Sequence, residues 1–338
     1  MMLVIGPRYD CKYPERTGGI VVLFEEFIRY CESHGHDIDI IDTNKGSYRF
    51  RICALLAIYA KIIKAMFKSD SIFLHGTMND YIYIVPYITI LGKLLNKKVY
   101  LRKFAGNFDV MYHELNVVCR NILAWCLKSA SVLFWETKKL VEFGKTFNDK
   151  AFWYPNVRNR YTKQAEKVYN KKLVFISHVN MNKGIDELMA VSDMLPAEYS
   201  IHIYGPIVDQ KYSEEFFAKS KVEYCGVLNA SDVQKTLTEY DVLVLPTKWS
   251  SEGYPGIIIE SFSVGIPVIS TYNGGIPEIV VQGENGLLVP SGNVKALFDA
   301  IMSIDASLYD KMRMGAYESF EQFDSEIVNA EVMSIIVG

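Results

Sequence analysis

The sequence lacks the signals that mark secreted, metal-binding and membrane-spanning proteins. Its six cysteines show no Cys-x-x-Cys spacing and no metal-like pairing with histidine, which predicts reduced core thiols of a cytosolic protein. The most apolar run, ICALLAIYA at residues 52–60, is far shorter than the ~20 residues needed to span a bilayer. The first residues are typical of a short strand, whereas a signal peptide starts with positive charge. We therefore expect a cytoplasmic protein without a metal or other cofactor.

Low-complexity tracts and short repeats are also absent, and half of the 338 residues are apolar. The length exceeds what one hydrophobic core usually serves, so two domains are expected. Residues 1–150 hold 21 Lys and Arg against 15 Asp and Glu, a balance of +6, and the net charge of −3 leaves −9 for residues 151–338. Either the first half faces an anionic membrane surface or phosphorylated acceptor, or solvated charges are distributed by chance.

Short apolar segments alternate with longer segments of helical period, which is typical of parallel sheets covered by helices. In the first half, strands are expected at residues 3–6, 37–42, 71–76, 98–106 and 131–136. In the second half, strands are expected at residues 173–178, 200–205, 222–226, 241–246 and 267–271. Between the two series, residues 152–172 lose the periodicity and are interpreted as a linker. The pattern predicts two doubly wound α/β domains with a cleft between their carboxyl strand ends.

Two glutamates, Glu252 and Glu260, flank the segment GYPGIII: Glu252 is expected on the loop after a strand, and Glu260 about one turn inside the following helix. The turn Tyr254-Pro255-Gly256 suits the tight backbone at the start of that helix. Free N–H groups and the positive end of the dipole make a helix start suitable for phosphate. Because a carboxylate on either side can accept hydrogen bonds from hydroxyls, the stretch fits a nucleotide-sugar, with ribose on one side and the sugar on the other.

Residues 252–290, EGYPGIIIESFSVGIPVISTYNGGIPEIVVQGENGLLVP, resemble the donor-site signature of family 4 glycosyltransferases, which are retaining enzymes of the GT-B fold. ISHVNMNKGIDEL at 176–188 is similar to the phosphate-binding loop of the family, and VEYCGVL at 222–228 to its base-contacting loop. Residues 17–42 resemble its first Gly-Gly loop, helix and second strand. The resemblance is specific in residues 173–290 and looser in residues 1–150.

The resemblance implies the GT-B architecture, in which two Rossmann-like, doubly wound α/β domains face each other across a cleft. Residues 1–155 would form the acceptor domain and residues 156–316 the nucleotide-sugar donor domain. The remaining residues, 317–338, would form a C-terminal helix that crosses back to the first domain.

The resemblance also implies roles for the matching residues. Glu260 would bind the ribose hydroxyls, Glu252 would bind hydroxyls of the donor sugar, and Lys183 would neutralise the leaving diphosphate. The backbone that would cradle the sugar and the diphosphate belongs to Tyr254, Pro255, Gly256 and Ile257. Gly18 and Gly19 would let the backbone of the other domain approach phosphate.

One position departs from the family pattern. The family usually has Arg five residues before the lysine, where this chain has His178. Arg is always cationic and bidentate, whereas a histidine is neutral for much of the time near pH 7. Either the diphosphate protonates His178, or the leaving group is stabilised less strongly. On the first domain, His75 is a candidate catalytic residue, and Arg102 and Lys103 are candidates to face the acceptor or the donor sugar.

The resemblance implies a retaining transferase that moves a sugar from a nucleotide-diphosphate sugar, with a UDP-sugar favoured, to a glycan or lipid-linked acceptor. The process would be bacterial cell-surface polysaccharide synthesis, with no nucleic acid as partner. The absence of an evident protein nucleophile fits front-face displacement. Two alternatives stay open: a non-catalytic nucleotide-sugar-binding subunit, prompted by His178, and a GT-B epimerase or phosphorylase, which the intact EGYPGIIIE loop disfavours.

Residues 47–68 combine basic and apolar side chains at helical spacing. The basic residues of this segment are Arg49, Arg51, Lys61, Lys64 and Lys68. The three lysines follow an i, i+3, i+7 pattern and share one helix face. The opposite side is expected to carry Ile58, Tyr59, Ile62, Ile63 and Met66. With that side packed on the sheet, the lysines remain available to an anionic leaflet, where each is worth ~1 kcal/mol. We therefore expect peripheral contact with the inner face of the membrane.

Overall fold

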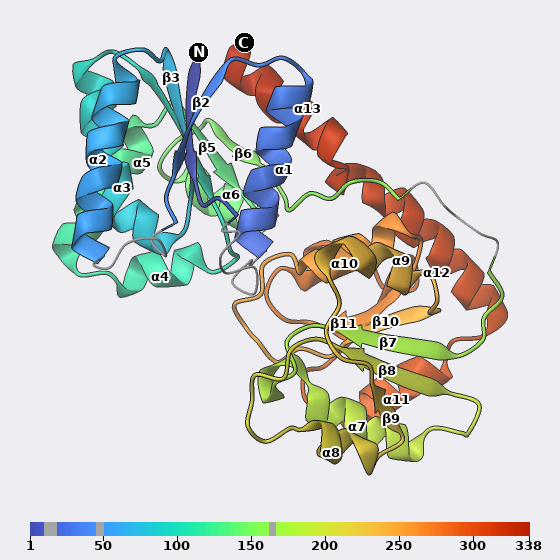
Figure 1. The fold of residues 1–338 in the computed structure, drawn as a ribbon. Coiled ribbons are helices and arrows are strands. Elements are labelled where there is room, and N and C mark those ends of the chain that lie inside the picture. The colour runs from blue at the N-terminus through green and yellow to red at the C-terminus, as the bar shows by residue number, and fades with distance from the viewer. Residues whose placement is uncertain (10–18, 45–50, 162–166) are drawn as a thin grey trace. The chain divides into compact units, whose positions relative to one another are not determined.

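The chain forms two compact units, of which the computed structural model describes residues 1–9, 19–44, 51–161 and 167–338. Unit 1 comprises residues 1–157 and 325–338, and unit 2 comprises residues 158–324. Each unit contains a six-stranded parallel sheet (Figure 1). The α/β fold class expected from the alternating pattern is confirmed. Gly18 and Arg49 lie outside the described residues, and Arg51 is described by its backbone only.

The unit 1 sheet has the order β2-β1-β3-β4-β5-β6. Its strands are β1 Met2–Gly6, β2 Ile38–Asp42, β3 Ser71–Gly76, β4 Lys98–Lys103, β5 Val132–Trp135 and β6 Ala151–Trp153. Its helices are α1 Gly19–Ser33, α2 Arg51–Met66, α3 Met78–Leu94, α4 Phe108–Glu114, α5 Val117–Ser129, α6 Lys138–Lys145 and α13 Ser325–Val337. Figure 1 shows α2, α3 and α5 on one side of the sheet and α1 and α13 on the other.

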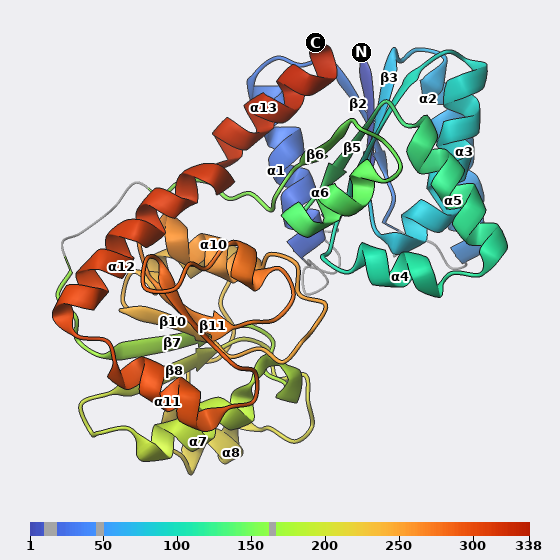
Figure 2. The same ribbon diagram turned by 180° about the vertical axis from the view of Figure 1, so that it is seen from behind.

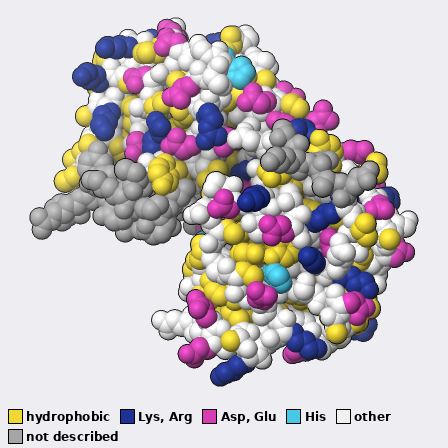
Figure 3. Space-filling view, turned by 45° about the vertical axis from the view of Figure 1, so that its right-hand side comes forward, with side chains coloured by type: hydrophobic (Ala, Val, Ile, Leu, Met, Phe, Trp, Pro, Cys, Tyr) yellow, Lys and Arg dark blue, Asp and Glu magenta, His cyan; other side chains and the backbone are white. Residues whose placement is uncertain are grey.

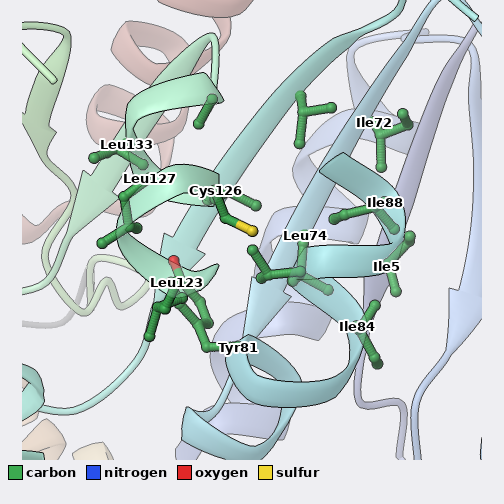
Figure 4. Close-up of a cluster of buried hydrophobic side chains, with 14 of the residues drawn as sticks. Ile5, Ile72, Leu74, Tyr81, Ile84, Ile88, Leu123, Cys126, Leu127 and Leu133 are labelled. Carbon is green, nitrogen blue, oxygen red and sulfur yellow. The ribbon is translucent and has the colours of Figure 1, made fainter. Parts of the chain in front are cut away.

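Alternation along β1 sends neighbouring side chains to opposite faces of the sheet. Leu3 and Ile5 belong to the core beneath α2, α3 and α5, whereas Met2 and Val4 belong to the core beneath α1 and α13. Figure 4 shows the first core, with these side chains labelled: Ile5, Ile72, Leu74, Tyr81, Ile84, Ile88, Leu123, Cys126, Leu127 and Leu133. Both faces of the sheet are therefore covered, as near-continuous apolar strands require.

The last helix, α13, completes the second of these cores. Its side chains Val328, Val332, Met333 and Ile336 are buried with those of α1. The hydroxyl of Tyr100 on β4 donates to the carbonyl of Ile336 at 2.9 Å, and Tyr154 donates to Oδ1 of Asn329 at 2.5 Å. The single helical segment expected near the C-terminus is two helices, because the chain leaves helical geometry at Asp324. Asp324 pairs instead with Arg160, at 2.9 Å.

Helix α2 buries one side and exposes a mixed one. Its buried residues are Ala54, Ile58, Ile62, Ala65 and Met66. Ile63 was expected on this side, but it is 42% exposed. The reason is helical geometry: Ile63 lies seven residues after Leu56 and four before Phe67, so it follows the row of exposed apolar residues Ile52, Leu56 and Phe67. Lys61, Lys64 and Lys68 are exposed as expected.

The unit 2 sheet has the order β12-β11-β10-β7-β8-β9. Its strands are β7 Lys172–Ile176, β8 Ser200–Tyr204, β9 Val222–Tyr224, β10 Val242–Leu245, β11 Val268–Thr271 and β12 Gly286–Val289. Its helices are α7 Ile185–Met194, α8 Glu214–Ala218, α9 Val233–Leu237, α10 Gly256–Ser263, α11 Val294–Met302 and α12 Ala306–Ser319. Figures 1 and 2 show α9, α10 and α12 on one face of the sheet and α7, α8 and α11 on the other.

In both units, side chains just before several helices accept hydrogen bonds from the first turn. Asn116 accepts from the N–H of Cys119, and Asn293 from that of Ala296, each at 2.9 Å. Such N-caps satisfy one of the N–H groups that the first turn leaves without a partner inside the helix. Helix α10 differs, because Pro255 is its N-cap residue and no side chain caps it.

The described residues include no helix with the length and apolar character that crossing a membrane would need. No described cysteine is in a disulfide, and Cys31 and Cys126 are buried while Cys53 is exposed. Burial raises the pKa of the Cys31 thiol to about 12 and that of Cys126 to about 11, which keeps both as unreactive thiols. On the face drawn in Figure 3, acidic and basic side chains are interspersed over both units.

Candidate functional site

A pocket of about 360 Å³ lies at the carboxyl ends of the central strands of unit 2. Its walls come from the segments after β7, β8, β9 and β10 and from the start of α10. The sequence-predicted residues that line it are His178, Lys183, Glu252, Pro255, Gly256, Ile257 and Glu260. Crevices at carboxyl strand ends are the usual ligand sites of parallel α/β sheets. The structure therefore brings together most of the residues that the motif in 252–260 and the loop after β7 predicted.

The loop after β7 positions Lys183. Asn180 accepts from the N–H of Lys183 at 3.1 Å and so begins the short 3₁₀ turn Met181–Lys183. Gly184 follows with φ +81°, and a Cβ at this position would overlap the carbonyl oxygen of Pro246. Only glycine allows the loop to pack this closely on the end of β10. The Nζ of Lys183 is thereby brought to Oε1 of Glu252, with which it forms an ion pair.

The backbone of Glu252 is fixed by the segment Asn273-Gly274-Gly275. The N–H of Gly275 donates to the carbonyl of Glu252 at 2.9 Å. Gly274 has φ +56°, and a Cβ there would overlap the same carbonyl. The carboxylate of Glu252 also accepts from the hydroxyl of Thr247, at 3.3 Å. The two glycines of this segment therefore hold Glu252 in place without contributing a side chain.

Glu260, near the middle of α10, pairs with Arg158. Nε of Arg158 lies 2.5 Å from Oε1 of Glu260. The guanidinium also packs on Gly256, where a Cβ would overlap Nη2 of Arg158. Arg158 was not among the predicted site residues. It stands in the polar stretch PNVRNR, 102 residues before Glu260, and the only signal in the sequence is a basic residue in the linker.

Both ion pairs are partly shielded from water. The four side chains of Lys183, Glu252, Arg158 and Glu260 are between 12% and 20% exposed. Partial burial strengthens charge interactions relative to the surface, and an uncapped helix start lies beside both pairs. Among the described residues, no three His, Cys, Asp or Glu side chains gather as a metal ion would require. The chemistry that the pocket offers is two cations and a helix start for an anion, with two carboxylates for hydroxyls.

The side chain of His178 is exposed, whereas that of Tyr254 is buried. His178 is exposed on the rim, two residues after β7 ends. Tyr254 is buried, and its hydroxyl donates to Oε2 of Glu278 at 2.6 Å. The tyrosine side chain therefore anchors the turn before α10 from within unit 2 and does not line the pocket.

The predicted residues of unit 1 are buried at the carboxyl ends of β3 and β4. His75 pairs in register with Arg102, and Lys103, the next residue of β4, pairs with Gly76. All three side chains are at most 2% exposed. His75 is enclosed by aromatic rings, and burial, with a smaller effect of Arg102, holds its pKa well below the ordinary value. These three side chains are therefore buried within unit 1, and their assignment to the acceptor or the donor sugar stays a prediction. Gly19 begins α1.

Buried contacts hold both cations, Arg102 and Lys103. The guanidinium of Arg102 stacks 3.4 Å from the ring centroid of Tyr154 and donates to the carbonyl of Pro155 at 3.0 Å. Burial lowers the pKa of Lys103 to about 8, although Glu136 and Asp80 oppose the shift. Glu136 accepts from the N–H of Ala105 at 2.7 Å, and Ala105 has φ +80°. A non-glycine residue in this conformation stores strain of about 1–3 kcal/mol.

Comparisons with known proteins match the second half of the chain in sequence and the whole chain in fold. Residues 170–305 match the family model described as Glycosyl transferases group 1. HepE (Alr3699) from Anabaena, solved in complex with UDP, superposes with a TM-score of 0.77 at 14% identity, covering 99% of each chain. The sucrose-phosphate synthase of Thermosynechococcus elongatus has a TM-score of 0.75 at 15% identity, covering 99% of this chain and 98% of that one. The fold is GT-B.

Within the GT-B fold, the residues that the family model matches, 170–305, lie in unit 2. The putative colanic acid biosynthesis glycosyltransferase WcaL of Salmonella typhimurium is 31% identical over 194 residues, which are 52% of this chain and 48% of WcaL. The amylovoran biosynthesis glycosyltransferase AmsK of Erwinia amylovora is 26% identical over 234 residues, 61% of this chain and 57% of AmsK. The GT-B chain thus spans about half the length of the curated relatives it matches.

Proposed function

We propose that the chain is a glycosyltransferase that moves a sugar from a nucleotide-diphosphate sugar to a glycan or lipid-linked acceptor. The observation that carries the proposal is the arrangement in unit 2 of two carboxylates, Glu252 and Glu260, each beside a cation, around the uncapped start of α10. This set of groups matches the charges and hydroxyls of a nucleotide-sugar. The family model and the names of WcaL and AmsK support the reaction class.

The donor would lie across the pocket with its base against Pro206, Val227 and Leu228. Glu260 binds the ribose hydroxyls, and Glu252 binds hydroxyls of the sugar. The diphosphate lies at Gly256 and Ile257, where the helix start favours negative charge. We propose UDP as the nucleotide; the support is that HepE was solved in complex with UDP and with UDP and glucose.

The proposed stereochemical course is retention by front-face displacement. The bond between the sugar anomeric carbon and the diphosphate oxygen breaks, and the diphosphate keeps the electron pair. The acceptor hydroxyl attacks from the same face, and its proton passes to the departing phosphate oxygen. Lys183 stabilises the charge that develops on the diphosphate, which is the largest demand of such a step. The engagement of Glu252 with Lys183 supports a binding role for this carboxylate.

The acceptor would be met at an anionic membrane surface, on the cytoplasmic side. On α2 the exposed apolar residues Ile52, Leu56 and Ile63, continued by Phe67, lie beside Lys61, Lys64 and Lys68. Apolar side chains that enter the headgroup region next to lysines that meet anionic lipid are the pattern of an interfacial helix. The names of relatives in colanic acid and amylovoran synthesis support a cell-surface polysaccharide as the product.

Two measurements test the proposal. Thermal unfolding of the purified protein with UDP-, GDP- and ADP-sugars should give a higher Tm with one base series, since a ligand at 100 times its Kd adds ~2.7 kcal/mol. The preferred donor, radiolabelled in the sugar, is then incubated with and without a lipid-linked acceptor. Label transferred to the acceptor supports the transferase, whereas binding without turnover supports a nucleotide-sugar-binding subunit. An altered sugar on released nucleotide, without acceptor, supports an epimerase.

A further inference from the structure

Two aromatic side chains are exposed beside the candidate site. Trp249, in the loop after β10, is 46% exposed, and Tyr272, directly after β11, is 55% exposed. Among the described residues of unit 2, no other phenylalanine, tyrosine or tryptophan is exposed. Because β10 and β11 are neighbours in a parallel sheet, both rings follow carboxyl strand ends. Exposed aromatic surface in unit 2 is therefore confined to the edge of the sheet that carries the site.

The loops that carry the two rings are tied to each other and to Glu252. Asn273, the residue after Tyr272, donates through Nδ2 to the carbonyl of Thr247 at 2.7 Å. Thr247 stands two residues before Trp249, whose carbonyl accepts from the N–H of Glu252 at 3.3 Å. The backbone beside each ring is therefore fixed with respect to the backbone of Glu252.

The faces of the two rings are available to a ligand. The indole N–H of Trp249 donates to Oγ of Ser251 in the same loop, so the polar atom of this ring already has a partner. Neither Trp249 nor Tyr272 packs against another ring or a cation within the part of the chain that the structure describes. The face of an aromatic ring is apolar and carries the negative side of its quadrupole. The C–H bonds on one face of a pyranose ring are apolar and weakly positive, so they suit such a surface.

The geometry of transfer decides which of the two substrates meets these rings. The proposed donor fills the pocket with its sugar at Glu252, and neither Trp249 nor Tyr272 lines that pocket. The attacking hydroxyl of the acceptor must come within about 3–3.5 Å of the anomeric carbon of the donor sugar. The part of the acceptor that carries this hydroxyl therefore lies outside the pocket, at the end where Glu252 and the two rings are.

We propose that Trp249 and Tyr272 form an acceptor subsite that stacks a pyranose ring. The attacking hydroxyl then belongs to a sugar, and not to an acyclic polyol or to a protein side chain. Unit 2 thus contributes to the binding of the acceptor as well as the donor. The inference rests on the proposed function, since it names the acceptor class of the same site.

The first test compares cyclic with acyclic acceptors that are soluble in water, so that no membrane is involved. The methyl pyranosides of glucose, galactose, mannose and N-acetylglucosamine are offered with the preferred donor, and sorbitol is the acyclic comparison. At least one pyranoside should be glycosylated with a kcat/KM at least about tenfold above that of sorbitol, since a stacked ring is held in place for attack. Equal use of sorbitol, or use of no pyranoside, would overturn the inference.

The second test removes the rings and follows the KM of the best pyranoside. Trp249→Leu keeps an apolar side chain without a ring, so it should raise this KM about 3- to 10-fold and leave the donor Kd unchanged. Tyr272→Leu should act in the same way, and the two changes together should raise the KM about 10- to 100-fold. Trp249→Phe retains a ring and should stay within about twofold of wild type. The matched control is Trp125→Leu, an exposed tryptophan on α5 of unit 1, which should leave the KM unchanged.

Tryptophan emission supplies a readout that a merely structural role would not move. The best pyranoside, added with UDP or the preferred nucleotide, should change the emission of wild type, and Trp249→Phe should lose this change while it keeps its activity. An equal rise in KM for Trp249→Leu and Trp249→Phe, or a weaker donor Kd with an unchanged acceptor KM, would overturn the inference. If wild type binds a nucleotide-sugar and uses no pyranoside, the proposed function survives; if it binds no nucleotide series, both fail.

Discussion

Glu260 and Glu252 are assigned to different parts of the donor, so their removal should have different effects. Glu260→Ala should weaken binding of free nucleotide by about 10- to 100-fold, because the ribose hydroxyls lose a charged acceptor. Glu252→Ala should leave nucleotide affinity near wild type and slow sugar transfer. Calorimetry and turnover of the donor measure the two effects, with exposed Glu284→Ala as control. Wild-type affinity for nucleotide in Glu260→Ala would remove the ribose assignment.

Lys183 and His178 line the same pocket, and His178 stands where the family resemblance has Arg. Lys183→Ala should lower kcat by about 10²- to 10³-fold, the usual cost of losing one donor to the charge of a transition state. His178→Arg should keep or raise kcat, since it adds a permanent cation at the rim. The matched control is Lys248→Ala. Lys248 is also a lysine in a loop after a strand of unit 2, five residues after Leu243 of β10, and it also forms an ion pair, with Glu187 at 3.0 Å. Turnover of Lys183→Ala near wild type would exclude the diphosphate role.

Lys103 should make the stability of unit 1 depend on pH. Burial lowers its pKa to about 8 in the folded protein, against 10.5 for an ordinary lysine. Between these values the unfolded chain binds more protons than the folded one, so the free energy of unfolding rises with pH in this window. Relative to Lys103→Met, wild type should gain up to about 3 kcal/mol from pH 8 to pH 10.5. Urea unfolding at both pH values measures the gain, and exposed Lys128→Met should show none. A constant difference between wild type and Lys103→Met would contradict the pKa.

At the scale of elements, strands with a clear apolar run were predictable and the short ones were not. All ten expected strands are present, whereas β6 and β12 were missed. β6 has three residues and only Ala151 is buried, so no periodicity develops before Pro155. β12 lies in the segment GENGLLVP, whose only apolar run is the short LLV. A run this short can belong to a loop as well as to a strand, so the sequence did not indicate a strand there. The strand expected to reach residue 106 ends at Lys103, because Ala105 adopts a positive φ that only tertiary contacts stabilise.

The candidate site was predictable where its residues adjoin one strand end. Glu252 lies in the loop between β10 and α10, and Gly256 and Glu260 lie in α10 itself, so their spacing in the sequence places them together. The partnership of Glu260 with Arg158 depends on how the linker packs on α10, which no local pattern encodes. Burial of His75 was also out of reach, since a histidine at a strand end has the same sequence signal whether it faces solvent or the core.

The segment Asn273-Gly274-Gly275 supports Glu252, and glycine substitutions should separate backbone strain from that support. Gly283 and Gly274 both have positive φ, but a Cβ meets nothing within 4 Å at Gly283 and overlaps the carbonyl of Glu252 at Gly274. Gly283→Ala should cost about 1–2 kcal/mol in unfolding free energy and leave donor affinity unchanged. Gly274→Ala should cost more and weaken donor binding. Urea unfolding and calorimetry check both; equal effects of the two variants would exclude the support by this segment.

At the scale of the whole molecule, the proposed membrane contact predicts a dependence on lipid charge. Wild type should sediment with anionic liposomes and not with zwitterionic ones, and added salt should release it. Changing Lys61, Lys64 and Lys68 to Glu should abolish sedimentation without altering nucleotide affinity, since each lysine is worth about 1 kcal/mol at an anionic surface. The control with the same charge change is Lys219, Lys235 and Lys311 to Glu, on unit 2. Equal sedimentation with both liposome types, or with neither, would contradict the docking.

The position of α13 has a consequence for biosynthesis on the ribosome. Residues 1–157 emerge first, yet the core beneath α1 stays open until Val328, Val332 and Ile336 have been translated. The 167 residues of unit 2 come between, which at about 5–20 residues per second takes roughly 10–30 s. During this interval the apolar face of α1 requires a transient cover, such as a chaperone. Unit 2 is therefore the first that can finish folding, although it is synthesised second. Unit 1, whose synthesis begins first, finishes folding last.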